Sequence, residues 1–154
     1  MGIFEKKKSR LIWRSKGETL AVEPWGENSL RVRAVMMGEL MDTDYALLPS
    51  QPCDSEIVLK DGRAELTNGR IRAVVEECGL SKTAQISFYA RQGKRLLREI
   101  DSAGALKLEA RRFKPIIGGD YRLTASFVSA PAEKLYGMGQ YQQEILDIKN
   151  CSFE

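Results

Sequence analysis

The chain has 154 residues, of which 43% are hydrophobic and 29% charged, within the ordinary range of one globular domain. It is too short for a (β/α)₈ barrel, which takes about 250 residues. Histidine is absent, and histidine is the usual general base near neutral pH and the commonest metal ligand, so histidine triads and zinc sites with histidine ligands are excluded.

The formal net charge of +3 comes from the N-terminal end. Residues 1–16 hold six basic side chains against Glu5 alone, a net +5, so the remainder of the chain carries −2. Such a balance lacks the clustered positive surface that nucleic-acid binding needs. We therefore expect a solvated basic leader at 1–17, a domain at 18–154 and no nucleic-acid partner. An interaction domain that uses the leader to contact RNA or anionic lipid is a weaker alternative.

The three cysteines are odd in number and far apart, and they form no Cys-x-x-Cys pair. This spacing predicts neither a disulfide framework nor a metal site, and no cofactor is expected. Reduced thiols favour a cytoplasmic location. No stretch approaches the roughly 18 apolar residues of a membrane span, and the run Leu11-Ile12-Trp13 is too short for a signal sequence.

Alternation of apolar and polar residues, typical of half-buried strands, begins near residue 19. It predicts strands at 20–22 and 30–36, with a turn between them, and it places Arg31 and Arg33 on a solvated outer face. Residues 38–55 are rich in Gly, Pro, Asp and Ser, which predicts a long loop with at most a short strand at 46–48.

Turn dipeptides such as Asp61-Gly62 and Asn68-Gly69 then divide the chain into further strands in hairpin style. These strands are expected at 56–60, 64–67, 70–76, 84–90, 95–100, 105–113 and 120–128. A single helical turn fits 131–135. About nine short strands and few helices predict an all-β fold, an antiparallel β-sandwich.

Two carboxylate pairs, Asp42 with Asp44 and Glu76 with Glu77, have the residue type that glycoside cleavage uses. The first pair lies in the predicted loop, where a solvated turn is the simpler interpretation. Adjacent glutamates on a strand point to opposite faces. We therefore predict no catalytic residue in either pair.

Among the twelve aromatic side chains, Trp25 is the best candidate for stacking on a sugar, because it lies in a predicted turn. A ring that caps the edge of the sandwich is the alternative. Phe88 and Tyr89 are neighbours on one predicted strand, so they face opposite ways and one of them belongs to the core.

Four segments in this order, and at this spacing, resemble one family. They are Val22–Arg33 (VEPWGENSLRVR), Asn68–Ile71 (NGRI), Ile86–Glu99 and Glu133–Gln140 (EKLYGMGQ). Together they resemble the N-terminal domain of glycoside hydrolase family 31, which comprises α-glucosidases, α-xylosidases and related enzymes. The last segment is similar to the family's Tyr-Gly-hydrophobic-Gly-Glu/Gln signature, and Leu146-Asp147-Ile148-Lys149 matches the Leu-Asp-x-Lys stretch that comes after it.

The resemblance implies a β-sandwich of the galactose-mutarotase-like (supersandwich) type, truncated at its C-terminal end. In the family it precedes a catalytic barrel that carries an aspartate nucleophile and an aspartate acid/base. Neither tryptophan here begins the family's Trp-x-Asp-Met motif, so no catalytic residue transfers. The chain alone is predicted to be inactive. The full-length enzyme would be a retaining glycosidase acting on oligosaccharides with terminal α-linked glucose or xylose.

The resemblance also implies partners and contacts. The domain would support the missing C-terminal barrel and narrow the substrate entrance, with Gln140 and Tyr141 near the base of a sugar-contacting loop. A stand-alone carbohydrate-binding module that uses Trp25 is the alternative function. Strands that lose neighbours through truncation would expose unpaired backbone groups, which predicts an edge-paired homodimer.

Overall fold

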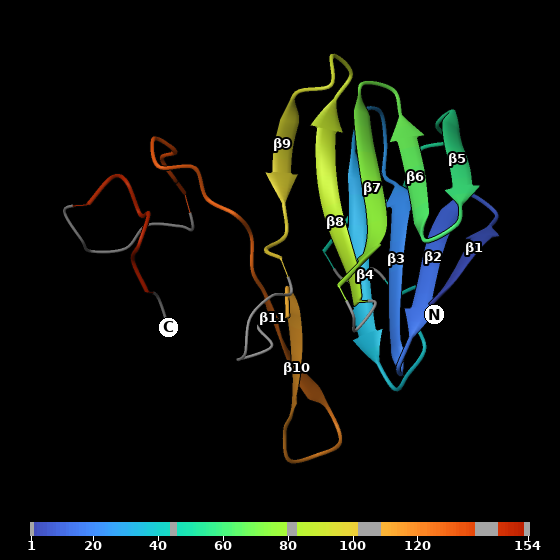
Figure 1. Ribbon diagram of the computed structural model, residues 1–154, viewed down its shortest axis with the longest axis horizontal. Helices are drawn as coiled ribbons and strands as arrows, with labels where there is room; N and C mark the ends of the chain where they lie inside the picture. The colour runs from blue at the N-terminus through green and yellow to red at the C-terminus, as the bar shows by residue number, and fades with distance from the viewer. Residues whose placement is uncertain (1, 44–45, 80–82, 102–108, 138–144, 153–154) are drawn as a thin grey trace.

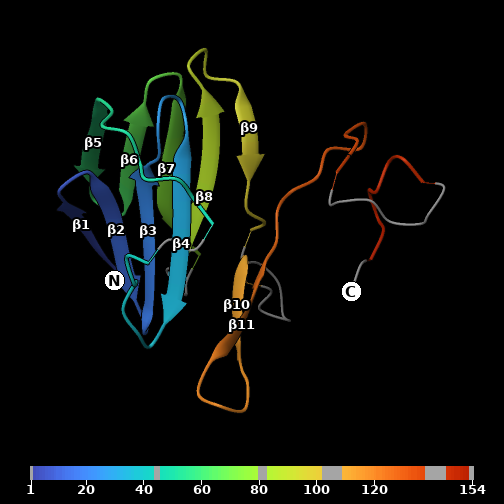
Figure 2. The same cartoon turned by 180° about the vertical axis from the view of Figure 1, so that it is seen from behind.

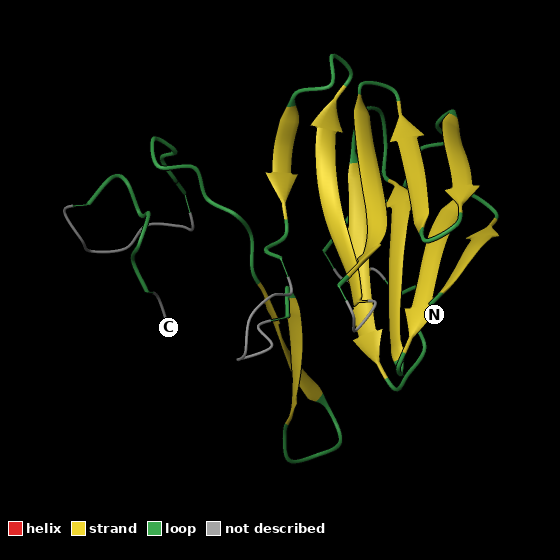
Figure 3. Cartoon of the chain, viewed as in Figure 1, coloured by secondary structure: helices red, strands yellow, loops and turns green. Residues whose placement is uncertain are grey.

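The computed structural model describes most of the chain, namely residues 2–43, 46–79, 83–101, 109–137 and 145–152. These residues form eleven strands and no helix (Figure 3). The strands make two antiparallel sheets, of four and five strands, and a two-stranded hairpin. The two sheets pack face to face (Figure 1). The predicted all-β antiparallel sandwich is therefore confirmed.

The first sheet is a meander in which each strand pairs with the next along the chain. Lys16 and Gly17 turn the chain between its second and third strands with φ of 51° and 84°, which is the left-handed geometry of a two-residue hairpin turn. Its strands are β1 (Ile3–Lys7), β2 (Arg10–Ser15), β3 (Glu18–Pro24) and β4 (Leu30–Met36).

The expectation of a solvated leader at 1–17 is wrong, because β1 and β2 belong to this sheet. Leu11 and Trp13 are 1% and 2% exposed and lie in the core, and Ile12 on the opposite face is 4% exposed. Residues 37–43 and 46–54 run over that opposite face (Figure 2). A strand covered on both faces shows a continuous apolar run instead of alternation, so the pattern of a half-buried strand does not find it.

The second sheet is also a meander of consecutive strands. Gly62 and Gly69 have φ of 66° and 58°, so the two predicted turn dipeptides do place a glycine in the left-handed region. Its strands are β5 (Ser55–Lys60), β6 (Arg63–Asn68), β7 (Ile71–Cys78), β8 (Thr83–Ala90) and β9 (Arg95–Arg98). All five were predicted to within about two residues at each end, the usual uncertainty of strand boundaries.

Three local expectations differ from the structure. Residues 46–48 form no strand, and residues 131–135 form a turn, in which the Glu133 N–H donates to the Ala130 carbonyl at 3.1 Å, and no helix. The last two strands, β10 (Arg111–Pro115) and β11 (Tyr121–Ala125), are shorter than predicted. Residues 105–108, most of the remainder of the first predicted strand, lie outside the described part.

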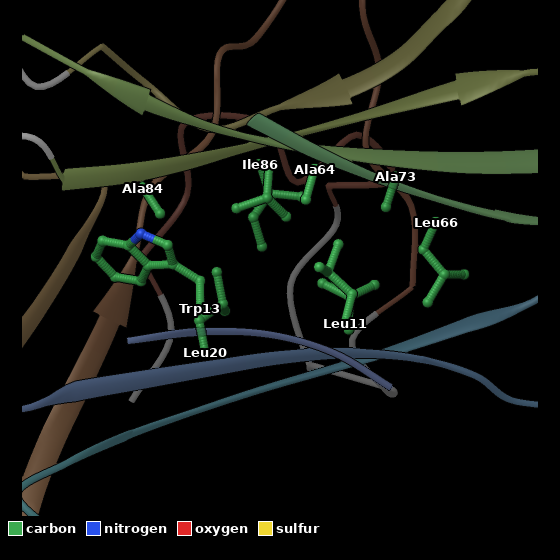
Figure 4. Packing of buried hydrophobic residues seen from close by; sticks show 10 residues of the cluster. Leu11, Trp13, Leu20, Ala64, Leu66, Ala73, Ala84 and Ile86 are labelled. Carbon is green, nitrogen blue, oxygen red and sulfur yellow. The ribbon is translucent and has the colours of Figure 1, made fainter. Parts of the chain in front are cut away.

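The core lies between the two sheets, and the second sheet contributes three alanines to it beside Leu66, Val75 and Ile86. Figure 4 shows the indole of Trp13 beside Ala84. Burying a large apolar side chain fully stabilises a fold by roughly 1.5–3 kcal/mol. The core cluster consists of Leu11, Trp13, Leu20, Val22, Ala64, Leu66, Ala73, Val75, Ala84 and Ile86.

The β10–β11 hairpin joins the sandwich through the chain immediately after it. The Ile100 N–H donates to the Ser126 carbonyl at 3.1 Å, and the Val128 N–H donates to the Arg98 carbonyl at 2.8 Å. Residues 126–128 thus continue the pairing of the second sheet beyond β9. All of β11 is exposed, and the chain after it runs away from the sandwich (Figure 1).

Candidate functional site

Trp25 lies in the turn between β3 and β4 and is half-buried. The guanidinium carbon of Arg31 is 3.6 Å from the centroid of its ring, a cation–π contact that covers one face of the indole. The turn is held by Asn68, whose side-chain amide donates to the carbonyls of Gly26 and Ser29 at 2.7 Å each. Trp25 is therefore fixed at the edge of the sandwich with one face of its ring covered, and its role in sugar contact stays a prediction.

Gln140 and Tyr141, the other two predicted contacts, lie outside the described residues, but the chain on both sides of them is described. The Ile148 N–H donates to the Leu135 carbonyl at 2.8 Å. The Asp147 carboxylate accepts hydrogen bonds from the backbone N–H of Leu135 at 3.0 Å and of Lys149 at 3.2 Å. The two ends of the segment that holds the predicted contacts are therefore tied together.

Asp147 makes these structural contacts, which the sequence reasoning did not predict. The hydrogen bond from the Leu135 N–H, together with that from Lys149, lowers the pKa of its carboxyl group below the ordinary value. Lys149 contributes too, because its ammonium group donates to the carbonyls of Ala130 and Pro131. The Leu-Asp-x-Lys stretch could have indicated these contacts, but it served only as part of the family resemblance.

The two glutamates of the second carboxylate pair lie on opposite faces, as predicted. Glu76 forms an ion pair with Arg63 on the outer face of the second sheet. Glu77 points to the other face, where its carboxylate accepts the indole N–H of Trp13 at 3.1 Å. Adjacent strand positions thus direct the two carboxylates to opposite faces, which excludes shared acid/base chemistry between them.

Asp42 also has structural partners. Its carboxylate forms ion pairs with Arg10 at 2.7 Å and Arg33 at 3.2 Å. The hydrogen bond from Arg10, then that from Arg33, lowers the pKa of the carboxyl group. Asp44 lies outside the described residues.

The prediction of a solvated face for Arg31 and Arg33 is wrong. Their side chains are only 11% and 17% exposed, and both donate to the carboxylate of Glu23, at 2.8 and 2.9 Å. Arg10 reaches the other oxygen of Glu23 at 2.8 Å. Glu23 itself is 5% exposed, so these cations neutralise a buried charge and are not presented to a ligand.

A second buried charge network was not foreseen. Arg111 of β10 donates to Glu99 and to Glu18 of β3, at 2.6 Å in each case, and to the Ala84 carbonyl of β8 at 2.8 Å. Glu99 in turn accepts the Ile86 N–H at 2.8 Å. Burial raises the pKa of Glu18, and the attraction of Arg111 offsets this only in part. One guanidinium thus joins both sheets to the hairpin.

A cavity of about 650 Å³ lies between β4 and the β10–β11 hairpin. Polar and apolar atoms line it about equally, and the apolar side chains include Met36, Met37, Phe113, Tyr121 and Leu123. Among the residues that the structure describes, no three potential metal ligands lie together. In the same residues no helix is long and apolar enough to cross a bilayer.

The protein is thus an antiparallel β-sandwich. Its candidate catalytic carboxylates in the described part, Asp42, Glu76 and Glu77, form ion pairs or hydrogen bonds within the fold. No family model matches the chain. Over 92% of its length it is 42% identical to a protein of Pseudescherichia vulneris named "uncharacterized family 31 glucosidase ORF2". The structure resembles that of a family 31 α-xylosidase from a soil metagenome, solved with xylose, with a TM-score of 0.83 and 41% identity over 97% of this chain.

The sequence is therefore homologous to a portion of glycoside hydrolase family 31 proteins, as its motifs indicated. The chain spans 29% of the length of the P. vulneris protein and 24% of the α-xylosidase chain. It thus aligns with about a quarter of each of these longer proteins.

Proposed function

We propose that the chain is the non-catalytic N-terminal β-sandwich domain of a retaining α-glycosidase, of the galactose-mutarotase-like type. In the full-length enzyme it supports the catalytic barrel and shapes the substrate entrance. The supporting observation is the identity of 41–42% across nearly the whole chain to proteins of which it spans a quarter. The structural partners of Glu76, Glu77 and Asp42 agree with a role that does not use these carboxylates in chemistry.

The proposed substrates of the full-length enzyme are oligosaccharides with terminal α-linked glucose or xylose. The names of the two similar proteins, a glucosidase and an α-xylosidase, support this class without choosing between the sugars. A cytoplasmic location is part of the proposal, and the free thiols of Cys53, Cys78 and Cys151 agree with it.

Substrate contact is assigned to three residues. Gln140 and Tyr141 belong to the segment whose ends Asp147 and Ile148 tie together. Trp25 is only half-buried, so part of its side chain can reach a ligand. These residues would shape the entrance while the barrel cleaves the bond.

An assay with aryl α-glucoside and aryl α-xyloside substrates tests the proposal. We expect no turnover by the purified 154-residue chain and turnover of one substrate by the full-length gene product. Turnover by the short chain above a mock-purified control would overturn its non-catalytic role. Failure of the full-length product on both substrates would overturn the proposed activity.

A stand-alone carbohydrate-binding module remains the second candidate, since Trp25 is partly exposed on a turn held by Asn68. Calorimetric titration with maltose and with xylose-containing oligosaccharides separates the two functions. Saturable binding that is lost in Trp25→Ala and kept in Tyr136→Ala would favour the module. The absence of binding would favour the supporting domain.

A further inference from the structure

Strand β5 lies at the end of the five-stranded sheet, and in the described part of the chain only β6 pairs with it. Two of its apolar side chains are exposed, Val58 at 38% and Leu59 at 43%. The free edge of a strand presents backbone N–H and C=O groups that can pair with another strand. An inference drawn from this edge does not rest on the proposed function.

The charged side chains of β5 are better arranged for pairing with a second copy than those of β1 and β9. β1 carries Lys6 and Lys7, and lysines on an edge strand oppose pairing with another copy. The edge of β9 is already occupied at Arg98, whose carbonyl accepts the Val128 N–H, and antiparallel pairing of β9 with itself would put Arg95 opposite Arg98. The sequence of β5, Ser-Glu-Ile-Val-Leu-Lys, instead has an acidic residue near one end and a basic residue at the other.

The two charged residues of β5 have no side-chain partner in the described part of the chain. Among the described residues, neither Glu56 nor Lys60 makes a side-chain hydrogen bond or an ion pair. In the register of β5 with β6, Glu56 lies opposite Thr67, and Lys60 lies opposite Arg63, which has the same charge. Both side chains are exposed and available to a second chain.

We propose that two copies of this chain associate by antiparallel pairing of β5 with β5, with Val58 on the two-fold axis. In this register Glu56 of each copy lies opposite Lys60 of the other, so the pairing makes two cross-strand ion pairs. Because side chains alternate between faces, Glu56, Val58 and Lys60 share the outer face. Ile57 then meets Leu59 of the other copy on the core face.

The core face gains from this pairing as well. Ile57 already packs against the core cluster, whereas Leu59 is exposed. Pairing Leu59 with Ile57 of the second copy covers it and joins the two cores across one ten-stranded sheet. A contact of six residues per strand falls short of the roughly 1,000 Å² of a stable interface, and β1 with its lysines lies against β5. The dimer is therefore weak and depends on concentration.

Sedimentation equilibrium over a wide concentration range tests the proposal. We expect a reversible monomer–dimer equilibrium for the chain. Glu56→Lys places lysine opposite lysine at both ends of the pairing and raises the dissociation constant by roughly tenfold or more. The double variant Glu56→Lys/Lys60→Glu exchanges the charges, recreates both ion pairs and returns the constant to the original value.

Glu39→Lys is the charge-matched control, because Glu39 is exposed and lies outside β5. It leaves the dissociation constant unchanged. Urea unfolding of each variant establishes that it is folded. A chain that stays monomeric at every concentration overturns the proposal, and so does a dimer that Glu56→Lys does not weaken or that the double variant does not restore.

Discussion

Arg111 shows how a single residue can join elements that are distant in sequence. Its hydrogen bond to Glu18 spans 93 positions, and its partners Glu99 and Ala84 belong to the other sheet. In the described chain, every buried side-chain nitrogen and oxygen atom has a hydrogen-bond partner. Removing one member of such a network leaves the others charged and unpaired in a dry environment, which costs more than the pair contributes.

We expect Arg111→Met to destabilise the fold by about 3–5 kcal/mol, since it leaves Glu99 buried without its cation. Urea unfolding followed by fluorescence measures the change. Arg112→Met is the matched control, because Arg112 is exposed, and surface substitutions usually stay within about 0.5 kcal/mol. Equal stabilities of the two variants would contradict the structural role of Arg111.

The raised pKa of Glu18 predicts a pH dependence. The folded state holds the proton of this carboxyl group more tightly than the unfolded state, so folding loses stability as pH rises from the unfolded pKa through the folded one. Glu18→Gln cannot ionise. Between about pH 4, near the ordinary carboxyl value, and about pH 7, the wild-type chain should therefore lose stability relative to Glu18→Gln. Urea unfolding at both pH values measures the difference, and a constant difference would refute the prediction.

At the scale of elements, the strands found from sequence are those with one face in the core and a turn dipeptide at the end. β6 alternates buried and half-buried residues from Arg63 to Asn68 and was predicted almost to the residue. β2 was missed because Leu11, Ile12 and Trp13 are all buried, so the strand shows no alternation. Its outer face is covered by residues 37–43 and 46–54, which depends on tertiary structure. The strand pattern carries no information about such covering.

Removing residues 2–16 should therefore unfold the chain. The deletion takes away β1 and β2 with Leu11 and Trp13, each worth roughly 1.5–3 kcal/mol of burial, and a domain has only about 5–15 kcal/mol of stability in total. Circular dichroism and urea titration should show no cooperative transition. Lys6→Thr/Lys7→Thr, which removes charge and keeps the strand, should unfold as the wild type does. A deletion variant with an unchanged midpoint would show that the leader interpretation was right.

The candidate site was less accessible to sequence reasoning than the fold. Gln140, Tyr141 and Trp25 were named through the resemblance and a turn pattern, and no contact in the described residues assigns them a ligand. Asp147 and Glu23 were missed for a physical reason. A carboxylate that holds backbone N–H groups, or that is buried beneath arginines, has the same sequence signature as one in water.

At the scale of the whole molecule, the sandwich consists of two meanders joined by segment 37–54, with the β10–β11 hairpin attached at one side. Ile117 is fully exposed, and Tyr121 and Leu123 of β11 are 38% and 42% exposed. These apolar residues lie away from the core cluster. Most of the hairpin is thus exposed in a chain that matches a quarter of a longer enzyme.

The meander order has a consequence for synthesis on the ribosome. Because every strand of β1 to β4 pairs with its immediate neighbour, this sheet needs no residue after Met36 to complete its ladder. Contacts between residues close in sequence form fastest. The first sheet can therefore form while the residues of the second are still being synthesised. Arg111, which contacts both sheets, is added after all of their strands.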